Sequence, residues 1–364
     1  MSAADAALNG VLAAGHERAV ALGPGYERLW SALVEACAGG RRFRPALVER
    51  THEALGGKLT EPVAQVGAAV ELLHTAFVVH DDVIDGDHVR RGRPNVSGTF
   101  AAHAAAAGTD AERTRTYADT AGILAGDLAL VAAVRTVASC GAPAPVVERL
   151  LDLLEATVHV TAAGELADVE LGLGLADDPL PLGDVITVGE HKTAVYSFQL
   201  PLQAGALLAG ADDDVVAALR EAGRLVGIGF QLVDDLKGVF GDPAVTGKVG
   251  PGDLREGKYT ALVAHARSTS AWPSLTTFVG DRHLDDAGVT RARELLTTCG
   301  SRAFVEALAG DYLSAALRRA SEAGLPGRLV SWFDVLVQEI SADLEATAGR
   351  VTAAVGGAGV GVRA

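Results

Sequence analysis

Aspartates occur in two short clusters, and apolar residues at helical spacing precede each cluster. The first cluster, HDDVID, contains Asp81, Asp82 and Asp85, and the second, FQLVDD, ends with Asp234 and Asp235. Residues four apart share one face of a helix, so Asp81 and Asp85 project together, one turn apart. Clustered carboxylates repel one another unless a cation lies between them, and carboxylate oxygens suit Mg²⁺. Both clusters therefore indicate metal held where an apolar helix ends.

Arginines follow the first aspartate cluster directly, at Arg90, Arg91 and Arg93. Guanidinium groups fork onto phosphate oxygens, so metal-binding acids followed by arginines indicate a diphosphate site. The apolar helix before the acids adds a lining for hydrocarbon, and the predicted substrate has a diphosphate head and an apolar tail. One such cluster could be an exposed helix end before a loop. Two clusters, at residues 81–85 and 234–235, make that alternative less favourable.

Lysine is rare in this chain, because only five of the 31 basic residues are lysines. Ordinary surface charge is provided by arginine, so each remaining lysine is more informative than usual. The net charge of −15 argues against nucleic-acid binding, which needs broad positive surfaces. Local basic clusters for small anions remain compatible with it.

The composition favours a cytoplasmic protein without stable membrane insertion. Three cysteines lie far apart and form no CxxC pair, which predicts a reducing compartment without disulfides or a zinc site. The N-terminus, MSAADAALNG, lacks the basic residues of a signal peptide. The most apolar run, residues 121–139, is interrupted by Asp127 and Arg135, so a buried helix is favoured over a spanning one.

Helical spacing extends through the whole chain, and sustained strand alternation is missing. Ala, Leu, Glu and Arg, which favour helices, dominate. Breaks rich in Gly and Pro predict about ten helices. The predicted breaks are near residues 39–40, 56–57, 85–98, 140–145, 172–183, 210–212, 241–257 and 324–327. Composition shifts at no single point, so we predict one all-α domain over residues 1–364, with a frayed Gly-rich tail over 351–364.

In their order and spacing, these motifs resemble the polyprenyl synthetase family, the trans-isoprenyl diphosphate synthases, over roughly residues 35–265. HDDVID with RRGRP resembles the first aspartate-rich motif of the family, and FQLVDD resembles the second. GGRRFRP at residues 39–45 resembles the GGKxxRP element. EHKTAVYSF resembles the KT motif, GELAD the GQxxD motif, and TGKVGPGDLREGK at residues 246–258 the lysine-bearing loop.

The resemblance implies an isoprenoid synthase bundle of ten or more helices around a central cavity. It implies Mg²⁺-dependent head-to-tail condensation of isopentenyl diphosphate with an allylic diphosphate. Two Mg²⁺ ions are implied at Asp81 and Asp85 and a third at Asp234, with Asp82 and Asp235 in support. A homodimer is implied by family habit.

The implied substrate ligands form two sets. The allylic diphosphate is held by Arg90, Lys192, Lys248 and Lys258, with Thr193 and Gln231 beside the reacting carbon. Isopentenyl diphosphate is held by Arg41, Arg44, His74 and Arg91. Loss of the allylic diphosphate leaves a cation, the double bond of isopentenyl diphosphate attacks it, and the released diphosphate takes the proton.

Three residues depart from the family pattern. Arg41 stands where the family usually has lysine, Gly238 replaces the third aspartate of the second motif, and Glu165 replaces the usual glutamine of GQxxD. The acids that bind metal are kept, so we expect the third metal to bind, but less tightly.

The residues just before Asp81 are expected to set the length of the product. In the family, aromatic residues four and five positions before the first aspartate form the floor of the cavity. This chain has Phe77 and Ala76 there, with Leu73 further down. One aromatic predicts geranylgeranyl diphosphate (C20), with farnesyl diphosphate (C15) as the alternative.

Three other classes of protein are weighed against a synthase. A terpene cyclase with a similar helical fold would not need the second diphosphate site that Arg41, Arg44 and Arg91 indicate. A non-catalytic subunit of a heteromeric synthase would be expected to lose some acids or lysines, and this chain keeps them. A plain helical binding protein would leave both aspartate clusters unexplained.

Overall fold

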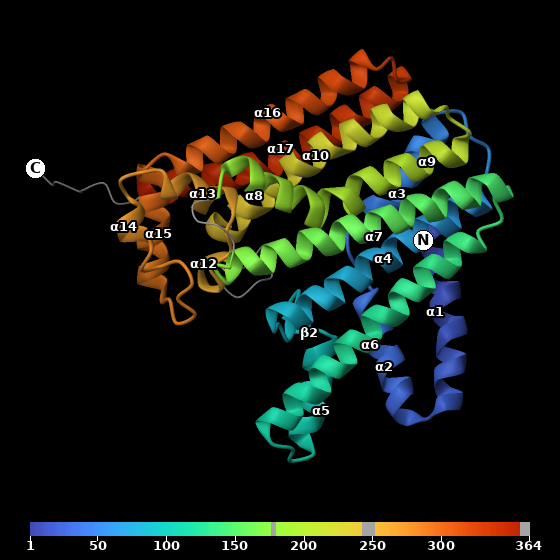
Figure 1. Cartoon of the computed structure of the whole chain (residues 1–364), viewed down its shortest axis with the longest axis horizontal. Helices are drawn as coiled ribbons and strands as arrows, with labels where there is room; N and C mark the ends of the chain where they lie inside the picture. The colour runs from blue at the N-terminus through green and yellow to red at the C-terminus, as the bar shows by residue number, and fades with distance from the viewer. Residues whose placement is uncertain (176–179, 242–251, 357–364) are drawn as a thin grey trace, which may run out of the picture. The chain divides into compact units, whose positions relative to one another are not determined.

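The computed structural model describes residues 1–175, 180–241 and 252–356. These residues are almost entirely helical, which confirms the all-α prediction (Figure 1). The chain forms two compact units, one built from Met1–Val158 and Tyr196–Arg220, the other from His159–Val195 and Glu221–Ala364. The single-domain assignment stays a prediction.

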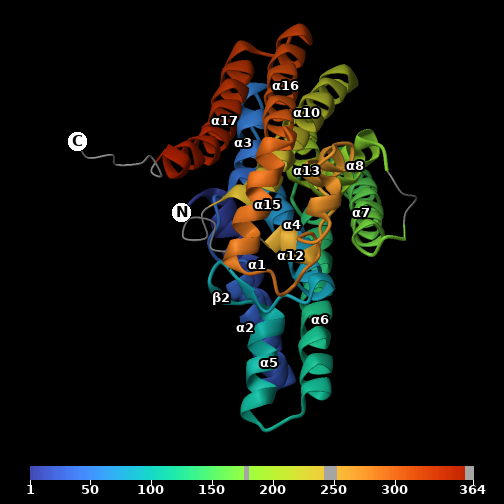
Figure 2. The same ribbon diagram turned by 90° about the vertical axis from the view of Figure 1, so that its left-hand side faces the viewer.

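The first unit contains the N-terminal helices and one short hairpin. Its elements are α1 (Ala3–Leu22), α2 (Pro24–Ala36), α3 (Phe43–Ala54), α4 (Glu61–Asp85), β1 (Val89–Arg90), β2 (Arg93–Pro94), α5 (Val96–Ala106), α6 (Ala111–Ala138) and α9 (Leu200–Ala209). Helix α4 packs against α1, α3, α6 and α9. The helices α5 and α6 lie side by side (Figures 1 and 2).

The second unit contains the C-terminal helices. Its elements are α8 (Leu182–Gly189), α12 (Gly252–Glu256), α13 (Ala261–Arg267), α14 (Trp272–Leu275), α15 (Asp286–Thr298), α16 (Ser301–Glu322) and α17 (Gly327–Gly356). Helix α13 contacts both α8 and α16, and α16 packs along α17. The chain passes between the units within α7 (Ala144–Gly172), the π-helix η1 (Glu190–Gln199) and α10 (Asp213–Phe240).

Helix α4 carries the first aspartate cluster, and its burial explains its composition. Its core positions include Val66, Val70 and Leu73, which are at most 2% exposed. Gly86 ends the helix in a left-handed conformation with φ of 72°. Helices α4 and α6 are long and apolar enough to cross a membrane. In the structure, 78% and 44% of their most apolar windows, respectively, are buried inside the protein.

The structure corrects several predicted boundaries. The described residues hold more helices than the ten or so predicted, because breaks at Gly23 and Gly108 also end helices. The hairpin of β1 and β2 was not predicted. Helix α10 does not end at the second aspartate cluster but continues to Phe240. Residues 351–356 belong to α17, and residues 357–364 lie outside the described residues, so the frayed tail stays a prediction.

Two glycines of α6 let this helix approach α4 closely. A Cβ atom on Gly122 would lie 2.2 Å from Cγ2 of Val83 in α4. A Cβ atom on Gly126 would lie 2.1 Å from Nε2 of His80, also in α4. Since α4 carries the aspartate cluster, these glycines fix the distance between that helix and its neighbour.

We therefore expect Gly122→Ala to destabilise the protein by about 1–3 kcal/mol, because the new methyl group overlaps the stiff Val83 side chain. The matched control is Gly10→Ala in α1, where a Cβ atom would meet nothing within 4 Å. This control should stabilise by about 0.5–1 kcal/mol, because alanine favours helix. Urea unfolding of both variants measures the effect, and the same sign in both would contradict the close packing.

Candidate active site

The first aspartate cluster lies at the end of α4, and Arg90 binds two of its three carboxylates. Asp82 is buried, with 3% of its surface exposed, and its Oδ1 accepts a hydrogen bond from Nε of Arg90 at 2.7 Å. Nη2 of Arg90 also donates to Oδ2 of Asp81 at 3.2 Å. Burial raises the pKa of Asp82, and the Arg90 guanidinium opposes this shift. Asp85 is half-buried at the end of the helix.

A tight hairpin turns Arg90 back toward these acids. Arg90 pairs with Arg93 across the strands. The two residues between them, Arg91 and Gly92, have φ of 53° and 73°, as in the two-residue turns that suit hairpins. Asn95 then fixes the exit, because its Nδ2 donates to the carbonyl oxygen of Asp87 at 2.7 Å.

The loop before α3 lies beside Arg91 and is anchored by Arg42. A Cβ atom on Gly40 would lie 3.5 Å from the guanidinium nitrogens of Arg91. Nη1 of Arg42 donates to Oε1 of Glu71 at 2.6 Å and Nη2 to the carbonyl oxygen of Cys37 at 2.6 Å. Arg41 and Arg91 are exposed. Arg42, which the sequence did not single out, therefore positions the loop that carries Arg41.

Arg44 is buried among aromatic rings. Its Nε and Nη2 donate to Oγ of Ser197 at 3.2 and 2.9 Å. Its guanidinium lies 4.4 Å from the ring centre of Phe43 and 5.2 Å from that of Tyr196. Burial lowers the pKa of Arg44, and the aromatic contacts suit a cation taken out of water. Arginine stays charged at any ordinary pH, so this side chain is a buried cation suited to an anion.

Tyr196 joins Arg44 to two other predicted residues. Its ring stacks on His74 with centroids 5.8 Å apart and meets the edge of Phe77 at 5.0 Å. Nδ1 of His74 is buried and has no hydrogen-bond partner within the described structure. Tyr196 and Ser197 were missed by the sequence analysis, although they follow the quoted Lys-Thr pair within the same motif.

The predicted chain-length residues differ in their surroundings. Leu73 and Ala76 are 0% and 1% exposed and belong to the core of the first unit. Phe77 is only partly buried and contacts Tyr196. Among these three residues, only Phe77 has a partly exposed side chain, and it packs against the edge of the core.

In the second unit, Lys192 forms hydrogen bonds with two acids of the GELAD motif. Nζ of Lys192 donates to Oε1 of Glu165 at 2.9 Å and to Oδ2 of Asp168 at 2.7 Å. A Cβ atom on Gly164 would lie 2.4 Å from the backbone nitrogen of Lys192, so the glycine permits this close approach of α7 and η1. Lys192 and the half-buried Thr193 lie in the π-helix η1, a type of helix frequent at functional sites.

The second aspartate cluster lies on α10 and contains one exposed and one half-buried carboxyl group. Asp234 is exposed. Burial, together with the charges of Asp253, Asp234 and Asp168, raises the pKa of Asp235 to about 8. Nε2 of Gln231 donates to Oδ1 of Asp235 at 2.8 Å. The neighbouring carboxylates therefore disfavour the charged form of Asp235.

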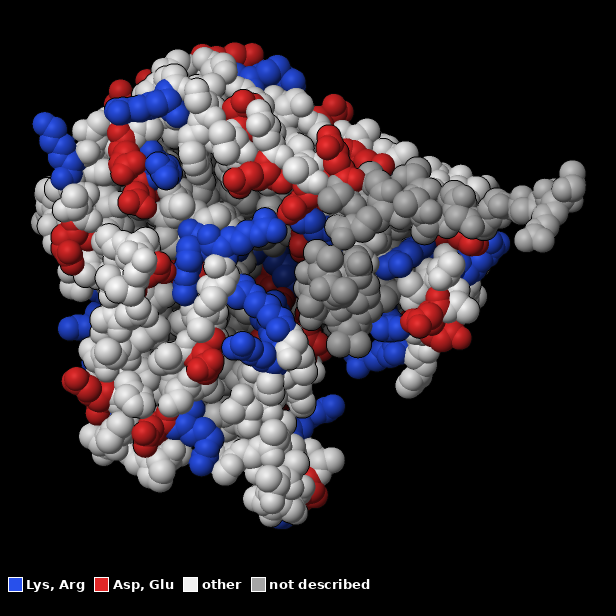
Figure 3. Space-filling model, turned by 180° about the vertical axis from the view of Figure 1, so that it is seen from behind, with Lys and Arg blue, Asp and Glu red and all other residues white. Residues whose placement is uncertain are grey.

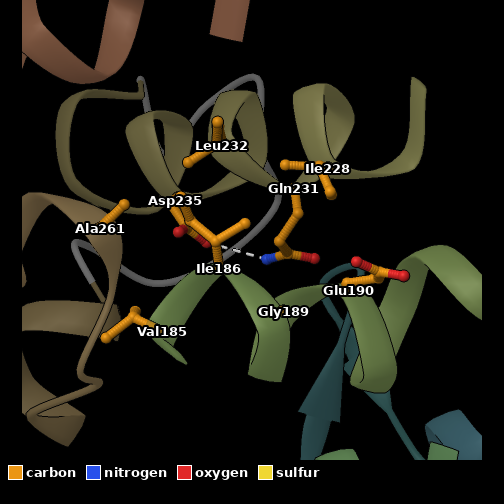
Figure 4. A pocket seen from close by; sticks show the side chains of 9 residues that line it. All are labelled: Val185, Ile186, Gly189, Glu190, Ile228, Gln231, Leu232, Asp235 and Ala261. Carbon is orange, nitrogen blue, oxygen red and sulfur yellow. Dashed lines mark hydrogen bonds between the residues drawn. The ribbon is translucent and has the colours of Figure 1, made fainter. Parts of the chain in front are cut away.

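An apolar pocket adjoins this cluster (Figure 4). Its lining comes from α8, η1, α10 and α13. The lining residues are Val185, Ile186, Gly189, Glu190, Ile228, Gln231, Leu232, Asp235 and Ala261. Figure 4 shows Gln231 and Asp235 pointing from α10 toward α8. The pocket thus offers an apolar wall next to the acids.

The remaining predicted ligands are less defined. Lys258 forms an ion pair with Glu256 at 3.2 Å. Lys248 lies outside the described residues. Within residues 1–175, 180–241 and 252–356, no three His, Cys, Asp or Glu side chains form a ready-made metal cage.

Charged side chains are unevenly distributed on the face seen in Figure 3. Lys and Arg gather in one limited area there, and both signs mix elsewhere on that face. The absence of a nucleic-acid partner stays a prediction.

Comparisons with known proteins agree with the resemblance found in the sequence motifs. Residues 27–296 match the polyprenyl synthetase family. Over 277 residues the chain is 33% identical to the geranylgeranyl diphosphate synthase of Methanosarcina mazei, covering 76% of this chain and 78% of that protein. Over 299 residues it is 32% identical to the (2E,6E)-farnesyl diphosphate synthase of Mycobacterium bovis, covering 79% and 76%.

A solved structure is also similar. It is the crystal structure of a geranylgeranyl pyrophosphate synthase from Corynebacterium glutamicum, complexed with isoprenyl diphosphate and magnesium. The TM-score is 0.85 at 28% sequence identity, covering 93% of this chain and 97% of that chain. The relatives of near-equal identity are named for products of different length, so identity leaves chain length unresolved.

Half-buried His74, whose Nδ1 is enclosed, predicts a specific pH dependence of stability. Burial and neighbouring arginines lower its pKa well below the usual 6.5. Below pH 6.5 the unfolded chain binds a proton that the folded protein rejects, so the free energy of unfolding falls as pH falls. His74→Gln should flatten this loss, by up to about 1.4 kcal/mol per pH unit for one proton.

Urea unfolding between pH 5 and 7 measures this slope. The matched control is His283→Gln, because His283 is exposed and should leave the wild-type slope unchanged. Parallel curves for wild type and His74→Gln would contradict the assignment of a neutral buried imidazole.

Proposed function

Since the chain belongs to the polyprenyl synthetase family and is a prenyltransferase, we propose that it condenses isopentenyl diphosphate head-to-tail with an allylic diphosphate to give geranylgeranyl diphosphate. Members of this family act on isopentenyl and allylic diphosphates and use Mg²⁺. The observation that carries the proposal is the pairing of Asp81 and Asp82 with Arg90 at the end of an apolar helix. Acids for metal and a base for phosphate are thereby held together.

Mg²⁺ fits the donor set of both clusters. The ions would be held by Asp81 and Asp85 and by Asp234, with Asp82 and Asp235 as supporting carboxylates. When bound, Mg²⁺ supplies positive charge that stabilises the departing diphosphate. Among the described residues, neither cluster forms a cage of three ligands, and substrate phosphates would complete the coordination of a bound ion.

The basic side chains are held by acids until substrate binds. Arg90 is bound to Asp81 and Asp82, and Lys192 to Glu165 and Asp168. We infer that a diphosphate would compete with these acids for the two side-chain cations. Lys248 and Lys258 complete this allylic set in the proposal.

Isopentenyl diphosphate is assigned to the first unit. The proposed ligands are Arg41, Arg44, His74 and Arg91. Arg44 contributes a desolvated cation, whose contact with an anion is stronger than in water. Neutral His74 provides ring nitrogens for hydrogen bonds without adding charge.

The chain's residues act on the cation by polarity and by excluding water. In the proposal, Thr193 and Gln231 lie beside the reacting carbon and stabilise it through their dipoles. The apolar pocket next to Gln231 keeps water from the cation. The carbon–oxygen bond of the allylic diphosphate breaks, the double bond of isopentenyl diphosphate forms the new carbon–carbon bond, and the released diphosphate takes the proton.

The C20 product is proposed from a single aromatic residue, Phe77, before the first aspartate cluster. One observation favours the C15 alternative. Tyr196 places a second ring against Phe77, at 5.0 Å, and so adds bulk at the same level. Farnesyl diphosphate synthase activity is therefore the second candidate. A homodimer, a cytoplasmic location and the lack of membrane insertion are part of the proposal.

Removing the first metal ligand should abolish turnover without unfolding the protein. We expect Asp81→Asn to lower kcat by orders of magnitude, because a carboxylate that binds Mg²⁺ is lost. A radiolabelled condensation assay with isopentenyl diphosphate and allylic starters measures kcat, and circular dichroism checks the helices. The control Asp152→Asn alters an exposed acid of α7 and should keep full activity. Near-normal activity of Asp81→Asn at low Mg²⁺ would refute the metal assignment.

Phe77 should control product length. Phe77→Ala removes the ring that meets Tyr196 and should lengthen the product by at least one five-carbon unit. Ala76→Phe should shorten it toward C15, but Ala76 is 1% exposed, so part of its effect will be lost stability. Chromatography of the dephosphorylated alcohols measures length, with Tyr117→Ala as the control aromatic. A wild-type product beyond C25, or an unchanged length in Phe77→Ala, would refute this floor.

A further inference from the structure

Arg42 connects four helices of the first unit through one guanidinium group. Its Nη1 donates to Oε1 of Glu71 in α4 at 2.6 Å, and its Nη2 donates to the carbonyl oxygen of Cys37 at the end of α2 at 2.6 Å. Its Nε lies 3.3 Å from Oδ1 of Asp5 in α1. Arg42 itself is the residue directly before α3. Each of its three nitrogens therefore meets an acceptor from a different helix.

The backbone of Arg42 is left-handed, with φ of 51° and ψ of 31°. Residues other than glycine rarely adopt this conformation, and they keep it only where the surrounding contacts impose it. Here the three contacts of the guanidinium group supply that constraint. Arg41 precedes Arg42 directly, and Arg44 lies in the first turn of α3. The backbone at residue 42 thus sets the direction of both predicted ligands.

Glu71 binds Arg42 inside the protein rather than at its surface. Glu71 is 6% exposed, and its Oε2 is buried without a hydrogen-bond partner within the described structure. A buried carboxylate that lost its cation would be strongly disfavoured, so Glu71 and Arg42 depend on each other. Glu71 lies three residues before His74 and therefore on the same face of α4. Arg42 is thus fixed to the helix face that also carries His74, another predicted ligand.

Asp5 approaches Arg42 from the first turn of α1. Its Oδ2 accepts hydrogen bonds from the backbone nitrogen and from Oγ of Ser2, at 3.0 and 2.9 Å, as part of a capping box. Its other oxygen, Oδ1, meets Arg42, and packing of α1 against α4 keeps this turn in place. Asp5 lies outside residues 27–296, which match the family. The contact between Asp5 and Arg42 is thus a feature of this chain rather than of the matched pattern.

The two acids stand beside a site that is proposed for an anion. As charges alone, Asp5 and Glu71 would repel a diphosphate and weaken its binding. Their positions are explained if they act on the Arg42 side chain instead of on the substrate.

We propose that Asp5, Arg42 and Glu71 are positioning residues of the isopentenyl diphosphate site. The two acids hold Arg42, and Arg42 keeps the backbone left-handed. This turn directs Arg41 and Arg44 toward the anion. The role rests on the proposed function, which assigns Arg41 and Arg44 to isopentenyl diphosphate. The first turn of α1 therefore contributes to the affinity for isopentenyl diphosphate but not to the affinity for the allylic substrate.

Binding of isopentenyl diphosphate to the whole chain tests this role, because without an allylic starter the ligand is not consumed. Calorimetry measures the Kd. Arg42→Gly accepts the left-handed backbone but removes the guanidinium group, and should raise the Kd about tenfold. Asp5→Asn should raise it about twofold to fivefold, as expected for a half-exposed ion pair. The KM of the allylic substrate should stay unchanged in both variants.

The direction of the change separates positioning from a simple charge effect. If Asp5 acted only as a negative charge, Asp5→Asn would remove repulsion and lower the Kd. If Asp5 acts through Arg42, the Kd rises, and Asp5→Asn adds nothing further in the Arg42→Gly variant. Glu71→Gln should also raise the Kd, whereas Asp5→Glu, which restores the carboxylate, should keep most of the affinity. Circular dichroism checks folding, and the two Asp5 variants decide the test if a variant of Arg42 or Glu71 unfolds.

The control and the reference variant separate this role from the proposed function. Glu17→Gln removes an exposed acid of α1 and should bind as the wild type does. Arg41→Gln removes a proposed ligand. If Arg41→Gln leaves the Kd unchanged, the proposed isopentenyl diphosphate site fails and the positioning role fails with it. If Arg41→Gln raises the Kd but Asp5→Asn lowers it or leaves it unchanged, only the positioning role is overturned. An equal rise in the KM of the allylic substrate overturns that role as well.

Discussion

Repulsion between neighbouring carboxylates is the constraint around which both aspartate clusters are built. Asp82 is buried at the C-terminal end of α4, where the helix dipole also disfavours negative charge. Arg90 offsets this by binding Asp81 and Asp82 together. In the second unit, Lys192 does the same for Glu165 and Asp168. Each pair of acids is therefore balanced by a side-chain cation already in place.

At Asp235, the repulsion between neighbouring carboxylates has a different consequence. Burial and the surrounding carboxylates raise its pKa to about 8, so the protonated form of this carboxyl is favoured. Glutamate at position 165 adds to the negative charge that holds Lys192, where the family usually has a neutral amide. The departures at Glu165 and Gly238 thus both concern how negative charge is distributed in the second unit.

Close backbone approach places these charges, and glycine permits it. Gly164 lets η1 approach α7 and brings Lys192 to the acids. The left-handed Arg91 and Gly92 close the hairpin that returns Arg90 to α4. In the first unit, Tyr196 connects a cation, Arg44, with the apolar Phe77. The proposed isopentenyl diphosphate site and the residue proposed to limit chain length therefore share one aromatic ring.

The sequence by itself determined the helical class, the two aspartate clusters and the basic residues that follow them. Periodicity of 3.6 residues and the i, i+4 spacing of Asp81 and Asp85 are local properties, so they can be read without a fold. It did not show that α10 continues past Asp235 to Phe240, because helix ends depend on packing as well as propensity. Nor could it find Arg42 or Tyr196. Their partners, Glu71 and His74, lie 29 and 122 residues away in the chain, and only tertiary packing decides which distant side chains share one space.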